Sequence, residues 1–420
     1  MSFETISVVG LGYIGLPTAA MFASRKKKVI GVDVNQAAVD TINRGEIHIV
    51  EPDLDMLVSA AVQQGYLKAV TTPEVADAFL IAVPTPFKPC EYGKIPEPDL
   101  SYIESAAKAI APVLKKGDLV ILESTSPVGA TEQMSDWLRE VRPDLTFPQT
   151  HGESADINIA HCPERVLPGH VVTELVQNDR VIGGMSKRCS ARSVELYKTF
   201  VMGECVVTNA RTAEMAKLTE NSSRDVQIAF ANELSIICDE LNIDVWELIS
   251  LANRHPRVNI LQPGPGVGGH CIAVDPWFIV SKTPEQANLI HTARSVNDKK
   301  PEWVLEKVKT AVAEFLQNNP NKAAEDVTIA CYGLAFKPDI DDLRESPALN
   351  IARTIADTHA GNVVAIEPNI TNLNIDNIEL VSLDFSLSNT DIHVMLVDHQ
   401  QFKKIKLNDK FIIDTKGIWK

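Results

Sequence analysis

The sequence predicts an α/β protein in which two doubly wound parallel-sheet domains are joined by a central long-helix segment. Three observations predict it. Short β-branched runs alternate with helical stretches over the first half, a long stretch without glycine or proline follows, and the strand pattern returns near residue 326. Such alternation is typical of parallel sheets with helices on both faces. A chain of 420 residues holds two or three domains, and we place them at 1–205, 206–318 and 319–420.

The expected strands of the N-terminal domain are short apolar runs separated by enough chain for crossover helices. We expect all of them to be buried and parallel. They are residues 6–9, 29–32, 79–83, 119–122 and 181–182, and the proline-rich segment 84–98 is expected to be a surface loop.

The central segment contains no glycine or proline from Thr212 to Ala252, and its apolar residues recur at helical spacing. This pattern predicts one long helix followed by a shorter one from Asp244. The C-terminal domain then offers strands at 327–331, 363–366, 392–397 and 411–413. Its opening repeats the strand–turn–helix pattern of the N-terminus but keeps a single glycine, Gly333.

The first strand is followed by the motif Gly10-Leu-Gly-Tyr-Ile-Gly15, which opens a helix. Gly10 permits the tight turn, Gly12 lets the backbone approach a pyrophosphate, and Gly15 lets helix and strand pack closely. Asp33 ends the second strand, 18 residues after Gly15, where it can accept hydrogen bonds from a ribose diol and repel a 2′-phosphate. These features predict a Rossmann-like domain that binds NAD rather than NADP.

Further cofactor contacts are expected where strands end at the same edge of the sheet. The loops V-P-T-P-F at 83–87 and S-T-S-P-V-G-A-T at 124–131 lie there, although their threonines could equally be turn or cap residues. The candidates are Tyr13, Ile14, Thr85, Thr125 and Thr131.

Residues 263–276, P-G-P-G-V-G-G-H-C-I-A-V-D-P, place four glycines within six residues just before Cys271. The glycines let the backbone crowd close to a ligand. We expect a helix to begin at the cysteine, which would lower the thiol pKa and favour a nucleophile. A turn followed by an inert structural cysteine is the alternative.

Lys217, Asn221 and Arg224 recur at i, i+4 and i+7 and share one face of the predicted long helix. Such a stripe is often only a solvated face. An amine and an amide one turn apart can also serve alcohol oxidation, because the amine relays a proton and the amide stabilises an oxyanion. Further cations suit a substrate with two phosphates, namely Arg254, His255, Arg257, Lys337, Arg344 and Lys416.

Composition narrows the function classes. The net charge of −15 argues against a nucleic-acid binder. Seven cysteines without a C-x-x-C pair predict neither a disulfide framework nor a metal site. No leader and no apolar run of membrane-spanning length is visible, so we expect a cytoplasmic protein without a membrane anchor.

Together the motifs resemble the UDP-glucose/GDP-mannose 6-dehydrogenase family over essentially the whole chain. They are G-L-G-Y-I-G-L-P at 10–17, S-T-S-P-V-G-A-T at 124–131, P-E-R-V-L-P-G at 163–169, K-x-x-x-N at 217–221, N-E-L at 232–234, G-G-H-C at 268–271 and A-F-K-P-D-I-D-D-L-R-E-S-P-A at 335–348. The resemblance implies a homodimer with an NAD-binding, a central helical and a UDP-binding domain. It also implies a four-electron oxidation of a UDP-sugar C6 alcohol to the carboxylate.

The resemblance also implies roles for single residues. Cys271 would be the nucleophile, and Lys217 would take a proton directly or through water. Asn221 would hold the substrate oxygen, Asp275 would orient the lysine or a water, and Glu164 would position the hydrolytic water. Substrate contacts would be Arg165, Val166, Lys217, Asn221, Arg224, His255, Arg257, Gly268, Phe336, Lys337 and Lys416, with Arg344 facing the cofactor and Arg257 or His255 reaching across a dimer interface.

One departure from the UDP-glucose branch bears on the sugar. That branch has C-x-x-K-D after the nucleophile, whereas this chain has Val274 in place of the lysine. With N-R-H-P-R-V-N at 253–259 and G-P-G-V-G-G-H-C-I at 264–272, the chain resembles the bacterial branch of the family that oxidises UDP-N-acetyl-D-mannosamine. The resemblance implies this substrate, for enterobacterial common antigen and related surface polysaccharides. UDP-glucose or UDP-N-acetylglucosamine oxidation, a two-electron hydroxyacid dehydrogenase and a non-catalytic NAD-sensing protein are the alternatives.

Overall fold

The computed structural model describes residues 3–49, 51–91, 93–167, 169–269, 271–370, 375–407 and 411–419. The chain divides into two compact units, Met1–Glu220 and Asn221–Lys420. His270 and Pro168, which belong to two of the motifs, lie outside the described residues.

The first unit is built on an eight-stranded sheet of order β3-β2-β1-β4-β5-β6-β7-β8. All neighbouring strands are parallel except β6 and β7. The five predicted strands are present, so the doubly wound α/β fold is confirmed for this unit. The strands are β1 (Thr5–Val9), β2 (Lys28–Val32), β3 (Leu67–Val70), β4 (Ala78–Ile81), β5 (Leu119–Leu122), β6 (Asn158–His161), β7 (Arg180–Gly184) and β8 (Cys205–Asn209).

Two expectations for this sheet need correction. The strand at 181–182 was expected to be parallel, but β7 runs antiparallel to β6, with Ala160 opposite Gly184. Strands β3, β6 and β8 were not expected; β8 is an edge strand whose Val206 and Val207 are exposed, so it carries no buried apolar run.

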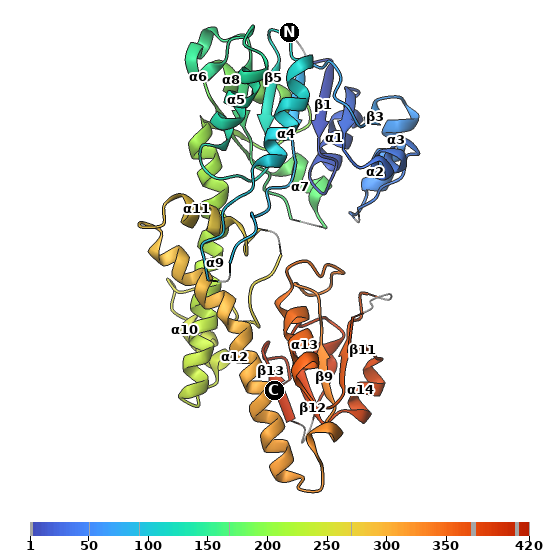
Figure 1. The fold of residues 1–420 in the computed structure, drawn as a ribbon, viewed down its shortest axis with the longest axis vertical. Helices are drawn as coiled ribbons and strands as arrows, with labels where there is room; N and C mark the ends of the chain where they lie inside the picture. The colour runs from blue at the N-terminus through green and yellow to red at the C-terminus, as the bar shows by residue number, and fades with distance from the viewer. Residues whose placement is uncertain are drawn as a thin grey trace. The chain divides into compact units, whose positions relative to one another are not determined.

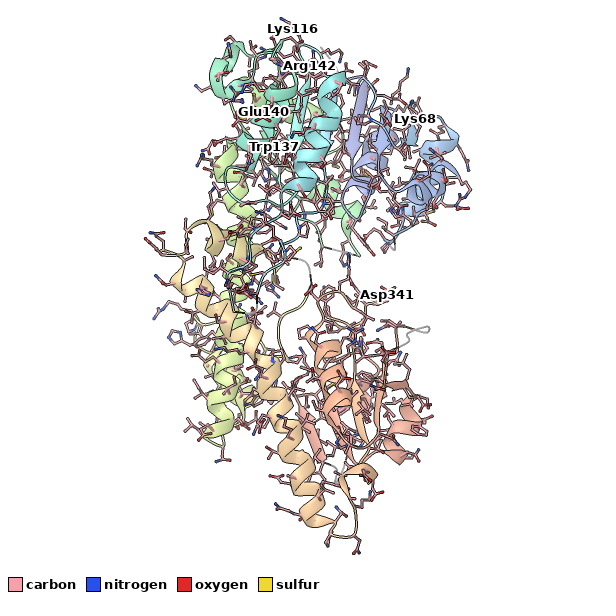
Figure 2. The ribbon with its side chains drawn as sticks, in the orientation of Figure 1. Lys68, Lys116, Trp137, Glu140, Arg142 and Asp341 are labelled. Atoms are coloured by element: carbon pink, nitrogen blue, oxygen red, sulfur yellow. The ribbon has the colours of Figure 1, made fainter. Side chains whose placement is uncertain are left out.

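Helices cover both faces of this sheet (Figure 1). On one face Phe22 and Tyr197 pack in the core, and on the other Trp137, labelled in Figure 2, packs with Phe79. The helices are α1 (Gly15–Ser24), α2 (Gln36–Asn43), α3 (Leu54–Gln63), α4 (Ser101–Ile110), α5 (Ala130–Val141), α6 (Pro148–His151), α7 (Val171–Gln177) and α8 (Lys187–Tyr197).

The second unit contains a five-stranded parallel sheet of order β11-β10-β9-β12-β13. The order matches β3-β2-β1-β4-β5 of the first sheet, which confirms the predicted repeat of the opening pattern. Helices α13 (Pro347–Thr358) and α14 (Leu383–Asn389) flank it. The strands are β9 (Ile329–Tyr332), β10 (Val363–Ile366), β11 (Glu379–Leu380), β12 (Ile392–Met395) and β13 (Phe411–Asp414).

The predicted long helix is α9 (Ala210–Glu240), and the shorter one is α10 (Val245–Ala252), where Asp244 accepts from the backbone nitrogens of Trp246 and Glu247. Two more helices follow, α11 (Asp275–Lys282) and α12 (Asn288–Asn318). A buried ion pair between Asp225 and Arg294 joins α9 to α12. Within the ranges given above, no helix has both the length and the apolar character needed to cross a membrane.

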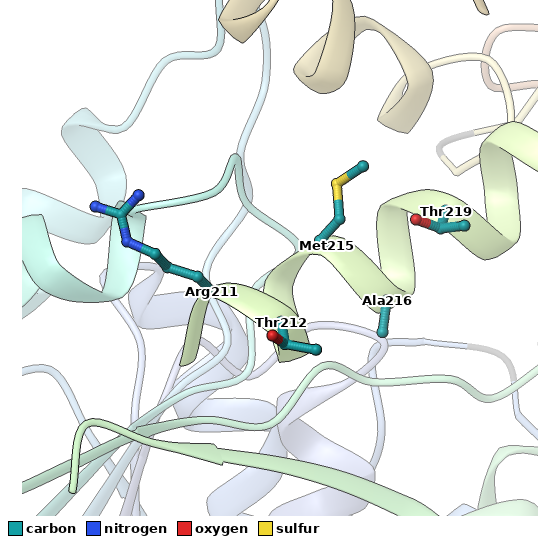
Figure 3. Close-up of a pocket in the computed structure, with 5 residues that line it drawn as sticks. All are labelled: Arg211, Thr212, Met215, Ala216 and Thr219. Carbon is teal, nitrogen blue, oxygen red and sulfur yellow. The ribbon is translucent and has the colours of Figure 1, made fainter. Parts of the chain in front are cut away.

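A pocket of about 530 Å³ lies at the start of α9 (Figure 3). Arg211 at its edge pairs with Glu132 of α5. No residue that the sequence predicted for the site lines it; the lining residues are Arg211, Thr212, Met215, Ala216 and Thr219.

Candidate active site

The glycine turn after β1 has the geometry that a dinucleotide needs. Gly10 has φ +92°, and a Cβ there would lie 2.6 Å from the Ala82 carbonyl oxygen. A Cβ on Gly15 would lie 1.7 Å from the Gly10 carbonyl oxygen, so neither position tolerates a side chain. A Cβ on Gly12 would meet no described atom within 4 Å, which leaves its backbone open to a ligand.

The charges around this turn also fit NAD. Helix α1 begins at Gly15, and among the described residues no side chain caps its first turn, so backbone N–H groups there can bind a pyrophosphate. Asp33 is half-buried at the end of β2 and accepts from the backbone nitrogens of Leu11 (2.8 Å) and Asn35 (2.9 Å). These bonds hold the carboxylate beside the turn, where its remaining lone pairs suit ribose hydroxyls. Tyr13, an exposed residue, and half-buried Ile14 complete the turn.

The threonines predicted to contact the cofactor differ in their hydrogen-bond partners. Thr85 donates to the Thr125 carbonyl oxygen (2.6 Å), which ties the two loops at the carboxyl edge of the sheet together. Thr131 is fully buried, and both its hydroxyl (2.6 Å) and its backbone nitrogen (2.8 Å) donate to Glu214 of α9. Glu214 also accepts from the Gly129 nitrogen (2.7 Å), so Thr131 helps to fix the start of α5.

Glu164 follows β6 and is buried in an ion pair that the sequence did not predict. One carboxylate oxygen accepts from Arg180 Nη1 (2.8 Å), and the other accepts from the backbone nitrogen of Arg165 (2.7 Å). The Arg165 guanidinium pairs with Glu220 of α9 (2.7 Å). Half-buried Val166 packs on the core, so this loop is fixed at several points.

Lys217, Asn221 and Arg224 lie on α9 at the predicted spacing. Lys217 and Asn221 are half-buried, whereas Arg224 is exposed. Asn221 donates through Nδ2 to an oxygen of Asp275, the buried first residue of α11 (2.5 Å). The second unit therefore brings the predicted amide and carboxylate into direct contact.

Cys271 is exposed, and its carbonyl oxygen accepts from the backbone nitrogens of Val274 (3.1 Å) and Asp275 (2.8 Å). The expectation that a helix begins at the cysteine is wrong, because α11 begins four residues later, at Asp275. Pro276 explains the difference, since proline is favoured in the first turn of a helix. The thiol is thus presented on a turn just before the helix.

The glycines before Cys271 allow the cysteine loop to pack tightly against the C-terminal sheet domain. A Cβ on Gly268 would lie 2.4 Å from the Glu345 carbonyl oxygen and 2.9 Å from Phe336 Cβ. The Gly264 nitrogen donates to Asn232 Oδ1 of α9 (2.9 Å). Cys271, Asn221, Asp275 and Phe336 thus belong to one packed assembly in this unit.

The other predicted cations of the second unit lie at its surface or in ion pairs. His255 and Arg257 are exposed, and the Arg257 nitrogen donates to His255 Nδ1 (3.3 Å). Lys337 is exposed, Arg344 pairs with Asp342 (2.5 Å), and Lys416 pairs with Asp398 (3.3 Å). Arg257 and Lys337 therefore present exposed positive charges, whereas the charges of Arg344 and Lys416 are paired with carboxylates.

Sequence reasoning assigned no role to three residues that hold the site residues in place, Arg180, Glu214 and Asn232, although Asn232 belongs to the N-E-L motif at 232–234. That motif was the available signal; in the structure Asn232 is fully buried and bonds to Asn297 of α12, as a buried amide requires. Arg180 lies 16 residues from Glu164, and Glu214 lies 83 residues from Thr131, so no local pattern indicates either pairing.

A glycine turn that fits a dinucleotide, and an exposed cysteine beside an amide–carboxylate pair, are together typical of an NAD-dependent dehydrogenase. Residues 4–201, 211–299 and 330–420 match the NAD binding, central and UDP binding domains of the UDP-glucose/GDP-mannose dehydrogenase family. The chain belongs to this family.

Its relatives span the full chain. It is 70% identical over 426 residues to the UDP-N-acetyl-D-mannosamine dehydrogenase of Yersinia pestis, covering 100% of both chains. It is 64% identical over 424 residues to the NDP-N-acetyl-D-galactosaminuronic acid dehydrogenase of Ralstonia nicotianae, covering 100% of this chain and 97% of that one. Among solved structures, UDP-D-ManNAc dehydrogenase of Pyrococcus horikoshii superposes with a TM-score of 0.86 at 37% identity, covering 99% of this chain and 96% of that chain.

Proposed function

We propose that this chain catalyses the NAD-dependent, four-electron oxidation of UDP-N-acetyl-D-mannosamine at C6 to UDP-N-acetyl-D-mannosaminuronate. The full-length identity of 70% to an enzyme of that name carries the choice of sugar. The exposed Cys271, whose carbonyl oxygen accepts from the nitrogen of Asp275, the partner of Asn221, supports the chemistry. The product would supply bacterial surface polysaccharides such as enterobacterial common antigen.

The first unit would hold the cofactor. Gly10, Gly12 and Gly15 shape the pyrophosphate turn, with Tyr13 and Ile14 beside it, and Asp33 receives the ribose hydroxyls. When bound, NAD⁺ supplies a hydride acceptor for each of the two oxidations. Thr85 and Thr125 line the carboxyl edge of the sheet, and we assign Thr131 a supporting role because its hydroxyl donates to Glu214.

The reacting groups would divide the work. Lys217 takes the hydroxyl proton directly or through water, while Asn221, oriented by Asp275, donates to the oxygen that gains charge. The Cys271 thiolate attacks the aldehyde to give a thiohemiacetal, whose oxidation gives a thioester. Water then releases the acid, with Glu164, fixed by Arg180, positioning that water.

The diphosphate of the UDP-sugar carries two negative charges, so cationic side chains would bind it. We propose Arg165, Val166, Arg224 and Gly268 near the sugar, and Phe336, Lys337 and Lys416 around the UDP group. Arg344 would face the cofactor, and His255 or Arg257 would reach the site of a second subunit. We also propose that the chain has three functional domains, residues 1–205, 206–318 and 319–420.

We further propose a cytoplasmic homodimer formed through the central helices. Apolar side chains support it, because Phe230 and Ile237 of α9 are 57% and 45% exposed and Leu251 of α10 is 59% exposed. Such exposed apolar surface on a helical segment favours association. Sedimentation equilibrium would test the dimer.

A second candidate substrate is an NDP-N-acetylgalactosamine, because two relatives named for its uronic acid are 64% and 63% identical over the whole chain. Val274, in place of lysine, favours either N-acetylated sugar over UDP-glucose.

The purified protein, assayed for NADH release with a panel of UDP-sugars, should turn over UDP-N-acetylmannosamine fastest. We expect two NADH per sugar, and about 10- to 200-fold lower kcat/KM for sugars that differ in one substituent. Activity confined to UDP-glucose or to an N-acetylgalactosamine nucleotide would replace the proposed sugar. One NADH per sugar would indicate a two-electron dehydrogenase, and absence of turnover with all sugars would favour an NAD-sensing protein.

Replacing Asn221 by Ala should lower kcat by about 10²-fold with little change in KM, because a donor to a developing oxyanion is lost. Steady-state kinetics would measure this. Gln227→Ala is the matched control, since Gln227 is an exposed amide on the same helix and donates to the Ser223 hydroxyl one turn away. An effect confined to KM would show that Asn221 merely binds the substrate.

A further inference from the structure

His399 follows β12 in the C-terminal sheet domain, and its side chain is fully buried. Its Nδ1 accepts from the Asp339 backbone nitrogen (2.9 Å) and lies 3.0 Å from Asn369 Nδ2. A backbone N–H can only donate, so Nδ1 carries no hydrogen. The ring hydrogen is therefore on Nε2, which lies 3.2 Å from a Glu367 oxygen and donates to it.

Glu367 ends β10 at the position that Asp33 occupies in the first sheet. The oxygen that receives His399 also accepts from the backbone nitrogens of Leu334 (2.7 Å) and Ala335 (3.1 Å). Burial raises the pKa of Glu367, but the bonds from His399 and the backbone outweigh it, and the pKa is lowered overall. His399 and Glu367 together thus anchor the loop after β9 at two places.

Phe336 and Lys337 lie between these anchors. Asp339, at the second anchor, has φ +61°, a left-handed conformation that costs energy for a residue other than glycine. Its nitrogen donates to His399, and its Oδ1 accepts from the Gln400 nitrogen (3.0 Å). Two consecutive residues, His399 and Gln400, therefore hold Asp339 in this strained conformation.

The anchored loop also touches the cysteine loop. A Cβ on Gly269 would lie 3.0 Å from Phe336 Cε2, and one on Gly268 would lie 2.9 Å from Phe336 Cβ. The Phe336 side chain is thus the surface on which the backbone leading to Cys271 rests. A shift of the anchored loop would move both Lys337 and the cysteine loop.

We propose that His399 is a positioning residue of the nucleotide-sugar site. As a neutral ring with its hydrogen on Nε2, it fixes the conformation of the 334–339 loop. The loop then presents Phe336 and Lys337 to the UDP group and supports the Cys271 loop. The inference rests on the proposed function in taking Phe336 and Lys337 as UDP contacts. If so, His399 sets the affinity for UDP without contacting the substrate.

The test compares His399→Gln, whose amide can reach the Nε2 position, with His399→Asn, whose Oδ1 can replace the Nδ1 acceptor. Calorimetric binding of UDP, KM for UDP-sugar and NAD, and the melting temperature would be measured for each. We expect His399→Gln to raise the UDP Kd and the UDP-sugar KM by about 10-fold, since one buried bond to Asp339 is lost, with the NAD KM unchanged. His399→Asn should recover much of the UDP affinity.

His359→Gln is the matched control, because this half-buried histidine of the same domain bonds to the Val327 carbonyl (2.8 Å), away from the loop. Unchanged UDP affinity in His399→Gln would overturn the proposal, as would equal weakening of UDP and NAD binding with a lower melting temperature, which would mark a structural role. Wild-type protein that binds UDP but oxidises no UDP-sugar would contradict the proposed function alone, and the UDP measurements would still decide the role of His399.

Discussion

Replacing Cys271 by Ser should lower the rate of acid formation by about 10⁴-fold or more, while NAD and UDP binding stay within a few-fold of wild type. A serine hydroxyl stays protonated at neutral pH, so it is a much weaker nucleophile than a cysteine thiolate. The aldehyde would not be captured, so the second oxidation would have no thiohemiacetal to act on. The first oxidation uses Lys217 and Asn221, which the substitution leaves in place.

The measurement is direct. When the wild-type enzyme is quenched in acid during turnover, intact-protein mass spectrometry should detect a covalent adduct on Cys271. The serine variant should show no adduct. Cys90→Ser is the matched control, because Cys90 is also exposed but lies in a loop of the first unit, where its thiol lies near the carbonyl oxygens of Glu91 and Lys94. Acid formation at the wild-type rate by the Cys271 variant would exclude a covalent route.

Much of the fold was predictable because the signals are local. The sequences of β5 and β10 are wholly apolar and buried, β1 and β2 are buried after their first residue, and the absence of glycine and proline marked α9. The strands that were missed lack such a signal. The sequence of β6 contains asparagine and histidine, and β8 exposes its valines at the sheet edge. The direction of β7 depends on how the chain crosses the sheet, which no four-residue pattern encodes.

The reacting and ligand-binding residues of the site were more predictable from the sequence than the residues that hold them in place. The glycine turn and Asp33 were found because a turn, a helix start and a strand end lie at fixed spacing. The contact between Asn221 and Asp275 joins residues 54 apart in the sequence, and the bond between Thr131 and Glu214 joins residues 83 apart. Such pairs follow from tertiary packing, so the helix face of Asn221 could be predicted but its carboxylate partner could not.

A buried polar network connects the cysteine loop to the central helices. Asn232 accepts from Gly264 and donates to Asn297 Oδ1 (2.9 Å), and Asn297 donates to an oxygen of Asp225 (2.8 Å). Arg294 pairs with the same Asp225 oxygen (2.7 Å), and both side chains are at most 1% exposed. Arg294 also bonds to Asp298. The network thus places a buried charge pair between α9 and α12.

Removing one partner of this pair should cost more stability than any surface change, about 3–5 kcal/mol for Arg294→Met, because Asp225 would remain buried without its counter-charge. Denaturant unfolding would measure the loss, and Lys309→Met on the exposed side of α12 should change stability by less than about 0.5 kcal/mol. The double variant Arg294→Met with Asp225→Leu removes both charges, so it should recover part of the loss, since an apolar pair avoids the cost of an unpaired buried charge. Additive losses in the double variant would show that the two charges do not stabilise each other, and that the hydrogen bonds of Asn297 and Asp298 carry this part of the fold instead.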